Sequence, residues 1–363
     1  MATENCNASD VLSRLPSRQD NSLSFASHLV VEPSTSLYRS AQQYMSRGEY
    51  LRAIDFARSS LRLSRNNSER INAVNLLSNL YYYVKAPEAC IAVIESFPDP
   101  LPSPYSTVLN DRLQRAISLR DFIKNCLSLY SKNNSGGFSL CPPVSGSIAI
   151  LGDSHVAAFA RLAESDKIYI SQVSPPLRGS CERLSKAIEE CAHYDHVVLS
   201  FCGNLHTIFS LSLDYSSLVP CSTIPFGEAE MADHFIRGIC YYAFDLKDAI
   251  NSRKTLGKPT YLAAPPPPKS VYSTKYLAER AVNDERLAKT QINENEQDYL
   301  LCWQVACNCL ASCAKSLDIG YIPHPDGCQD QNGFLLDVYH RDLTHANSSY
   351  ANLFLDSFFA VTN

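Results

Sequence analysis

Residues 147–155 read SIAILGDSH, a short apolar run that ends in Gly152, Asp153 and Ser154. Four further apolar runs follow along the chain, at 167–173, 197–201, 260–264 and 319–322. Helical patterns separate or follow them, at 155–164, 181–191, 228–252, 276–289, 297–317 and 345–359. Buried runs separated by helices are typical of a parallel sheet covered on both faces. The sequence therefore predicts a three-layer α/β/α domain with a parallel five-stranded sheet over residues 147–363.

The chain before this domain follows helical rather than strand-like periods, from residue 36 to residue 130. Ala53, Ala57 and Leu61 recur at helical spacings, and Gly48 interrupts the pattern where two antiparallel helices would need a turn. Residues 131–146 are rich in Gly, Pro, Ser and Asn, as linkers are. The sequence thus predicts a flexible N-terminus over 1–35, an all-α domain over 36–130, and a linker over 131–146.

Residues 41–67, AQQYMSRGEYLRAIDFARSSLRLSRNN, resemble a tetratricopeptide repeat, which is a pair of antiparallel helices. Gly48, Tyr50, Ala53 and Leu61 stand at consensus-like places, whereas Arg65 stands where a helix-ending proline is usual. A degraded second pair follows at 71–97, and a third helix at 108–130. The resemblance implies a docking module for a partner protein. The alternative is a helical extension that has no partner.

Composition limits the remaining function classes. The 363 residues include 32 basic and 37 acidic side chains, for a net charge of −5, which argues against a dedicated nucleic-acid binder. No apolar stretch is long enough to cross a membrane, and the N-terminus does not read as a signal peptide, so we expect a cytoplasmic protein. The 14 cysteines are scattered over a long chain, which favours buried thiols over a disulfide framework.

Chemistry-bearing residues stand at the ends of the predicted elements. Ser154 would lie near a helix N-terminus, where backbone N–H groups can stabilise an oxyanion, although Ser and Asp are also ordinary helix caps. Asp342 stands three residues before His345, so its carboxylate can bind one ring nitrogen while the other faces a serine. Asp337 and His340 share this spacing. The later pair is preferred because His345 adjoins the start of the last predicted helix.

In this order the motifs resemble the SGNH (GDSL-type) hydrolase family, over residues 147–363. That family has a flavodoxin-like sheet, opens with a strand followed by Gly-Asp-Ser, and closes with Asp-x-x-His before the final helix. The resemblance implies that Ser154 is the nucleophile, His345 the general base and Asp342 the acid that orients it. It predicts acyl transfer at a carboxylic ester through an acyl-enzyme.

The resemblance also implies an oxyanion hole. Its donors would be the backbone N–H groups of Ser154 and Gly179 and the side-chain amide of Asn204. The family's third block is usually Gly-x-Asn-Asp, whereas here Asn204 directly follows Gly203 in DHVVLSFCGNLH. Either the loop is one residue tighter or another donor serves, and His206 is the candidate substitute.

The Gly-Asp-Ser-His form of the first motif resembles acyl esterases and acyltransferases that act on polysaccharides. The expected substrate is therefore an O-acetylated sugar, oligosaccharide or glycan precursor. Hydrolysis needs no cofactor, whereas transfer would need an acyl donor, for which acetyl-CoA is the candidate. The alternative from another class is a catalytically silent fold that serves as a repeat-based protein-binding scaffold. A thioesterase or lipase on the same residues is a third reading.

A cluster of cysteines invites a metal-site interpretation. The four, which are Cys302, Cys307, Cys309 and Cys313, fall inside one apolar helical run, LLCWQVACNCLASCAK. Ligands from one straight helix cannot surround a tetrahedral metal ion. The sequence therefore predicts buried core thiols here and no metal site.

Overall fold

The computed structural model of the chain describes residues 34–97, 105–133, 145–152, 156, 158–159, 167–173, 182–201, 228–280, 295–342 and 345–359. Within these ranges the chain forms two compact units, and the division between them falls inside helix α6 (Tyr105–Asn133), after Asp121. Most of the expected linker and N-terminus lie outside the described residues, so the boundaries expected from the sequence stay predictions.

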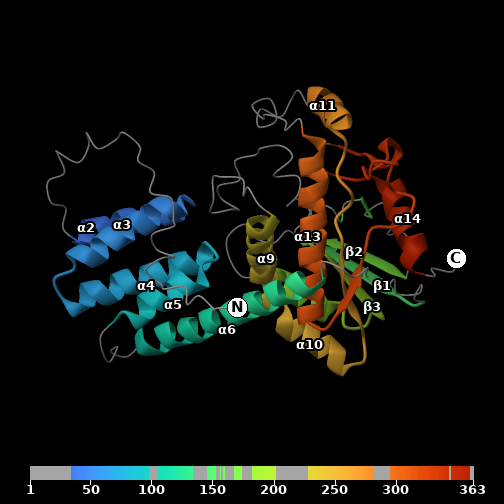
Figure 1. Cartoon of the computed structure of the whole chain (residues 1–363). Coiled ribbons are helices and arrows are strands. Elements are labelled where there is room, and N and C mark those ends of the chain that lie inside the picture. The colour runs from blue at the N-terminus through green and yellow to red at the C-terminus, as the bar shows by residue number, and fades with distance from the viewer. Residues whose placement is uncertain are drawn as a thin grey trace. The chain divides into compact units, whose positions relative to one another are not determined.

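The first unit is all helical (Figure 1). It contains α2 (Ser34–Ser46), α3 (Tyr50–Leu63), α4 (Asn67–Tyr83), α5 (Pro87–Glu95) and the first part of α6. Gly48 takes a positive φ of 79° in the turn between α2 and α3, where a residue without a side chain is favoured. Ala53 and Ala57 are fully buried, and the Ser60 hydroxyl donates to the Ser34 carbonyl at 2.8 Å. Small residues thus let α2 and α3 pack closely, while the repeat assignment stays a prediction.

The second unit is built on a five-stranded sheet whose strands are all parallel, in the order β2-β1-β3-β4-β5. The strands are β1 (Ile148–Gly152), β2 (Ile168–Gln172), β3 (His196–Ser200), β4 (Thr260–Ala263) and β5 (Gly320–Ile322). β1 lies between β2 and β3 and is buried along its whole length. The predicted α/β fold with a parallel five-stranded sheet, preceded by a helical region, is confirmed.

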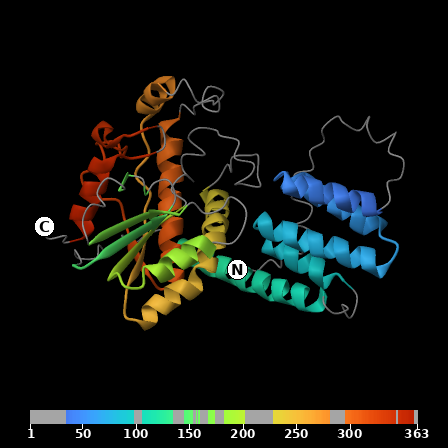
Figure 2. The ribbon, with the colours of Figure 1, turned by 180° about the vertical axis from the view of Figure 1, so that it is seen from behind.

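Helices cover the sheet on two sides. They are α7 (Glu182–Glu190), α9 (Glu228–Asp245), α10 (Lys247–Thr255), α11 (Val271–Arg280), α13 (Glu296–Ser316) and α14 (Ser348–Phe358). Figures 1 and 2 show α13 and α14 on opposite sides of the sheet. Phe354 of α14 belongs to the same buried hydrophobic cluster as Ile150 of β1 and Val198 of β3. None of the helices in the described ranges is both long and apolar enough to cross a membrane.

Helix α14 runs from the carboxyl ends of the strands towards their amino ends. Tyr350, in its first turn, lines a cavity together with Ser200, the last residue of β3. Beyond its last turn, the Phe359 ring lies against the rings of His196 and Tyr261 near the beginnings of β3 and β4. The segment that leads into α14 therefore lies at the carboxyl edge of the sheet, where the chemistry of such folds collects.

Gly152 is the last residue of β1 and lies in very close contact with β3. It pairs with Ser200, and a Cβ atom on Gly152 would stand 1.8 Å from the Ser200 carbonyl oxygen. The same Cβ atom would stand 2.8 Å from a methyl group of Val156. Any side chain here would push β1 and β3 apart at the edge where both strands end.

We expect Gly152→Ala to lower the free energy of unfolding by at least about 2 kcal/mol, because the backbone of β3 has to move. Gly238 of α9 is the matched control, since nothing in the described part of the chain lies within 4 Å of the Cβ atom that it lacks. Gly238→Ala should raise stability by about 0.5–1 kcal/mol, as alanine does inside a helix. Urea denaturation of both variants checks this, and equal effects would contradict the packing argument.

Candidate active site

A tight loop precedes α14. His340 and Ala346 form an isolated antiparallel bridge, and the Asn347 backbone N–H donates to the Tyr339 carbonyl at 2.8 Å. The Arg341 backbone N–H donates to the His345 carbonyl across the same loop at 3.1 Å. The chain therefore folds back on itself between His340 and Asn347, and this stretch contains Asp342 and His345.

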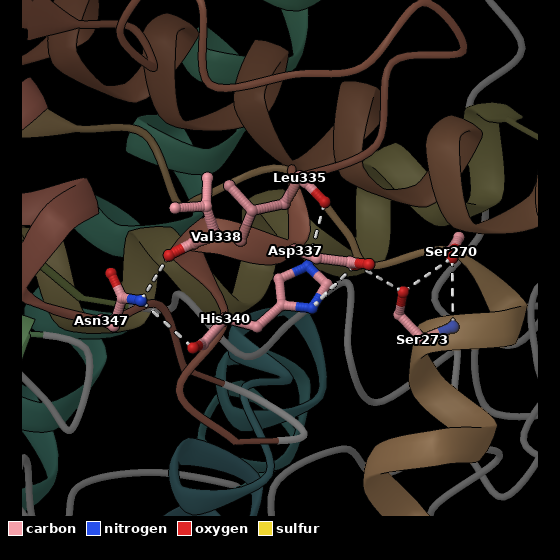
Figure 3. Close-up of polar contacts among 7 residues, drawn as sticks. All are labelled: Ser270, Ser273, Leu335, Asp337, Val338, His340 and Asn347. Atoms are coloured by element: carbon pink, nitrogen blue, oxygen red, sulfur yellow. Dashed lines mark hydrogen bonds and ion pairs between the residues drawn. The ribbon is translucent and has the colours of Figure 1, made fainter.

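One amide side chain anchors the loop to the helix. The Asn347 side-chain oxygen accepts from the backbone N–H groups of Ser349 and Tyr350, which makes it the N-cap of α14. Its side-chain nitrogen donates to the carbonyls of Val338 at 2.7 Å and His340 at 3.2 Å (Figure 3). Asn347 thus fixes the loop at both ends through a single side chain.

Asp342 and His345 contact each other within this loop, as their spacing predicts. His345 Nδ1 lies 2.8 Å and 2.9 Å from the two Asp342 carboxylate oxygens, and the His345 backbone N–H donates to one of them at 2.9 Å. Because an ionised carboxylate only accepts, Nδ1 carries the proton and Nε2 is the basic atom of a neutral ring. Nε2 is buried. This arrangement is that of a general base held by an orienting acid.

The rival pair is held differently (Figure 3). His340 Nε2 lies 2.9 Å from the Leu335 carbonyl oxygen and therefore donates to it. His340 Nδ1 lies 3.3 Å from Asp337, whose carboxylate also accepts from the Ser273 hydroxyl at 2.8 Å. Burial lowers the pKa of His340, and the charge of Lys269 lowers it further. Both ring nitrogens thus face local partners, which favours a structural role for His340 and leaves Asp342–His345 as the candidate pair.

Lys269 is a site residue that sequence reasoning missed. It follows the proline run after β4, and the Leu335 backbone N–H donates to the Pro268 carbonyl at 2.8 Å. Lys269 is only 7% exposed, and burial lowers its pKa from 10.5 to about 8 against the opposing charge of Asp342. A lone cation after the apolar run 260–268 was the signal available in the sequence. The candidate acid therefore lies near a buried ammonium group.

A small cavity lies beside the loop. Its volume is about 20 Å³, a little more than the space for one water molecule. It is lined by Ile150, Ala158, Phe159, Val198, Ser200, Ala263, Ala264, Pro266, Ala346, Tyr350 and Phe354. Ala346 directly follows His345, and the Tyr350 hydroxyl is buried without a hydrogen-bond partner in the described part of the chain. The lining is therefore mostly apolar, and the Tyr350 hydroxyl is a buried polar atom within it.

The other predicted site residues lie outside the described residues, and these are Ser154, Gly179, Gly203, Asn204 and His206. The strands that precede two of these segments end side by side, with Gly152 opposite Ser200. The structure thus brings together Asp342 and His345, and the roles of the remaining residues stay predictions.

No protein-family model matches the chain, and no curated protein matches it. One matching solved structure is described as a "putative platelet activating factor from Streptococcus pneumonia". It is 16% identical, with a TM-score of 0.35, and the match covers 69% of this chain and 96% of that chain. A similarity this distant carries no argument about activity, so the site has to be judged on its own geometry.

The buried Lys269 predicts a pH dependence of stability. Because its pKa falls from 10.5 to about 8 in the folded chain, the unfolded chain binds more protons between these two values. The free energy of unfolding should therefore rise with pH across this window. Lys269→Met removes the buried charge, so it should stabilise the protein at neutral pH by up to about 3 kcal/mol and should lack the rise.

Urea denaturation between about pH 7 and pH 10 measures this difference. Lys275→Met is the matched control, because Lys275 is an exposed lysine of the following helix, α11. The free energy of unfolding of Lys275→Met should depend on pH as that of the wild type does. If the free energy of unfolding of Lys269→Met rises with pH as steeply as that of the wild type, Lys269 is not the group that causes the pH dependence.

Proposed function

We propose that the chain is a serine-dependent acyl-ester hydrolase or O-acyltransferase that works through an acyl-enzyme on Ser154. The observation that carries this proposal is the contact between Asp342 and His345, in which both carboxylate oxygens hold Nδ1. A histidine fixed in this way presents a basic Nε2 to a nucleophile. The pair also lies at the carboxyl edge of a parallel sheet, and β1, which lies between β2 and β3, leads into Ser154.

In the proposed mechanism the Ser154 hydroxyl attacks the ester carbonyl and its proton passes to His345 Nε2. Asp342 stabilises the imidazolium that forms. The oxyanion would accept hydrogen bonds from the backbone N–H groups of Ser154 and Gly179 and from the Asn204 side chain, next to Gly203. His206 is the alternative donor.

The ester C–O bond then breaks, and the departing alcohol takes the proton from His345. This leaves the acyl group bound to the Ser154 oxygen. In the second half an acceptor hydroxyl gives its proton to His345 and attacks the acyl carbon. The bond from that carbon to the Ser154 oxygen then breaks, and Ser154 takes the proton back from His345. The acceptor is water in a hydrolase and a sugar hydroxyl in a transferase. A transferase would load Ser154 from an acyl donor, for which acetyl-CoA is the candidate.

The cavity supports a short acyl group. Its volume of about 20 Å³ accommodates a methyl or carbonyl group, and Ala346 places it next to His345. The mostly apolar lining suits the methyl of an acetyl group, and the Tyr350 hydroxyl offers it one hydrogen bond. Together with the Gly-Asp-Ser-His motif, this supports an O-acetylated sugar, oligosaccharide or glycan precursor as the substrate.

The helical region 36–130 is the proposed docking module for a partner protein. A scaffold function for the whole chain, with a silent second domain, is the alternative to catalysis. The two differ in whether Ser154 is activated, and labelling of that residue separates them.

We expect a serine-directed fluorophosphonate to label Ser154 in the purified full-length chain. Ser154→Ala should abolish labelling, and His345→Ala should slow it at least about 100-fold, since a general base contributes on this scale. His340→Gln is the matched control and should label at the wild-type rate. Mass spectrometry of the digested adduct locates the label, and circular dichroism checks that each variant is folded.

Two outcomes would overturn the assignment. If His340→Gln stops labelling while His345→Ala does not, the base has been misassigned. If the folded wild-type chain does not react at Ser154 at all, the scaffold alternative replaces the enzyme.

The cavity predicts a preference for short acyl groups. The wild type should cleave nitrophenyl acetate at least about tenfold faster than nitrophenyl octanoate, as judged by kcat/KM. Phe159→Leu should enlarge the cavity and shift the preference towards butyrate, because Phe159 lines it. Phe122→Leu alters a buried phenylalanine that packs on Phe244 outside the cavity, so the preference should stay unchanged. If the preference is unchanged in Phe159→Leu, the cavity does not bind the acyl group.

A further inference from the structure

Three buried cysteines converge in the second unit. Cys126 belongs to α6, Cys240 to α9 and Cys313 to α13. Their sulfur atoms all lie within 4.8 Å of one another, and none of the three forms a disulfide bond. Among the described residues, no other group of three or more His, Cys, Asp or Glu side chains meets in this way. This group is called the thiol cluster below.

The thiol cluster is assembled by helix packing. The Tyr130 hydroxyl of α6 donates to the Glu228 carboxylate of α9 at 2.8 Å. The Asn125 side chain of α6 donates to the Ser316 hydroxyl at the end of α13 at 2.7 Å. These contacts flank Cys126 on both sides along α6. The sulfurs therefore come from three separately positioned helices, so the objection that one straight helix cannot surround a metal ion does not apply to them.

The spacing of the sulfurs fits a metal centre. With zinc–sulfur bonds of about 2.3 Å, the sulfurs of a tetrahedral site stand about 3.8 Å apart, which falls inside the observed limit. The Ser316 hydroxyl and both other thiols hydrogen-bond with the Cys126 sulfur, so an oxygen is present beside the three sulfurs. By contrast, the neighbouring Cys309 thiol donates to the Ala232 carbonyl at 3.7 Å and does not belong to the cluster.

We propose that Cys126, Cys240 and Cys313 bind one thiophilic divalent cation of the zinc class through three sulfur ligands. The Ser316 hydroxyl, or a water molecule beside it, supplies the fourth ligand that a tetrahedral zinc ion takes. Each thiol releases its proton to solvent as its sulfur binds the ion, so three protons leave for each ion bound. The ion joins the second half of α6 to α9 and α13. This site is independent of the proposed esterase activity.

The test uses the full-length chain, reduced with a phosphine and stripped of metal by a chelator. Co²⁺ is the spectroscopic probe, because bonds from thiolate sulfur to cobalt give intense charge-transfer absorption that oxygen ligands do not. Zn²⁺ should displace the cobalt, and titration in buffers of different ionisation enthalpy counts the protons released. We expect one ion per chain and up to three protons per ion.

Cys240→Ser and Cys313→Ser should each weaken binding more than about 100-fold, since each removes a ligand. Cys309→Ser is the matched control, because Cys309 is a buried cysteine one turn earlier on α13, and it should bind like the wild type. Circular dichroism confirms that the variants are folded. The proposal is overturned if the wild type gives no thiolate–cobalt absorption, or if the triple variant of all three cysteines binds as tightly as the wild type.

Discussion

The close contact between Gly152 and the Ser200 carbonyl is the constraint on which the carboxyl edge of the sheet depends. β1 leads into the candidate site, and both of its neighbours are paired with it up to Gly152. The cavity beside His345 is lined in part by Ile150 of β1 and by Val198 and Ser200 of β3, so a change in the spacing of these two strands would alter it. Glycine is required here for its missing side chain, since its backbone φ is not in the left-handed region.

The strands could be predicted closely from the sequence because each is a short apolar run. β1 is buried on both faces, so its sequence is continuously apolar and no polar residue alternates within it. The ends of such a run are easy to recognise. The ends of the helices were harder to predict from the sequence. The predicted helix at 228–252 is interrupted at Leu246, a buried apolar residue without the usual signal of glycine or proline. The last helix begins at Ser348, where Asn347 is the cap, rather than at residue 345.

Part of the candidate site could be predicted because Asp342 and His345 are only three residues apart. Contacts at that separation depend mainly on the local sequence. The same spacing could not separate them from Asp337 and His340. The Leu335 carbonyl and the Ser273 hydroxyl distinguish the pairs, and both depend on how distant segments pack. Lys269 and the thiol cluster were missed for the same reason. Their partners lie on other elements, and periodicity along one helix carries no information about them.

Asn347 has a consequence for chemical ageing. The sequence places a serine directly after it, and asparagine is among the thermolabile residues. In the folded chain its amide oxygen and nitrogen are both hydrogen-bonded, which restrains the side chain from attack by the following backbone nitrogen. An unfolded chain loses that protection. A molecule that hydrolyses this amide while unfolded refolds with a carboxylate, which still caps α14 but cannot donate to Val338 or His340. Each period in the unfolded state would then convert some molecules irreversibly, and after refolding these would lack two hydrogen bonds in the loop that holds His345.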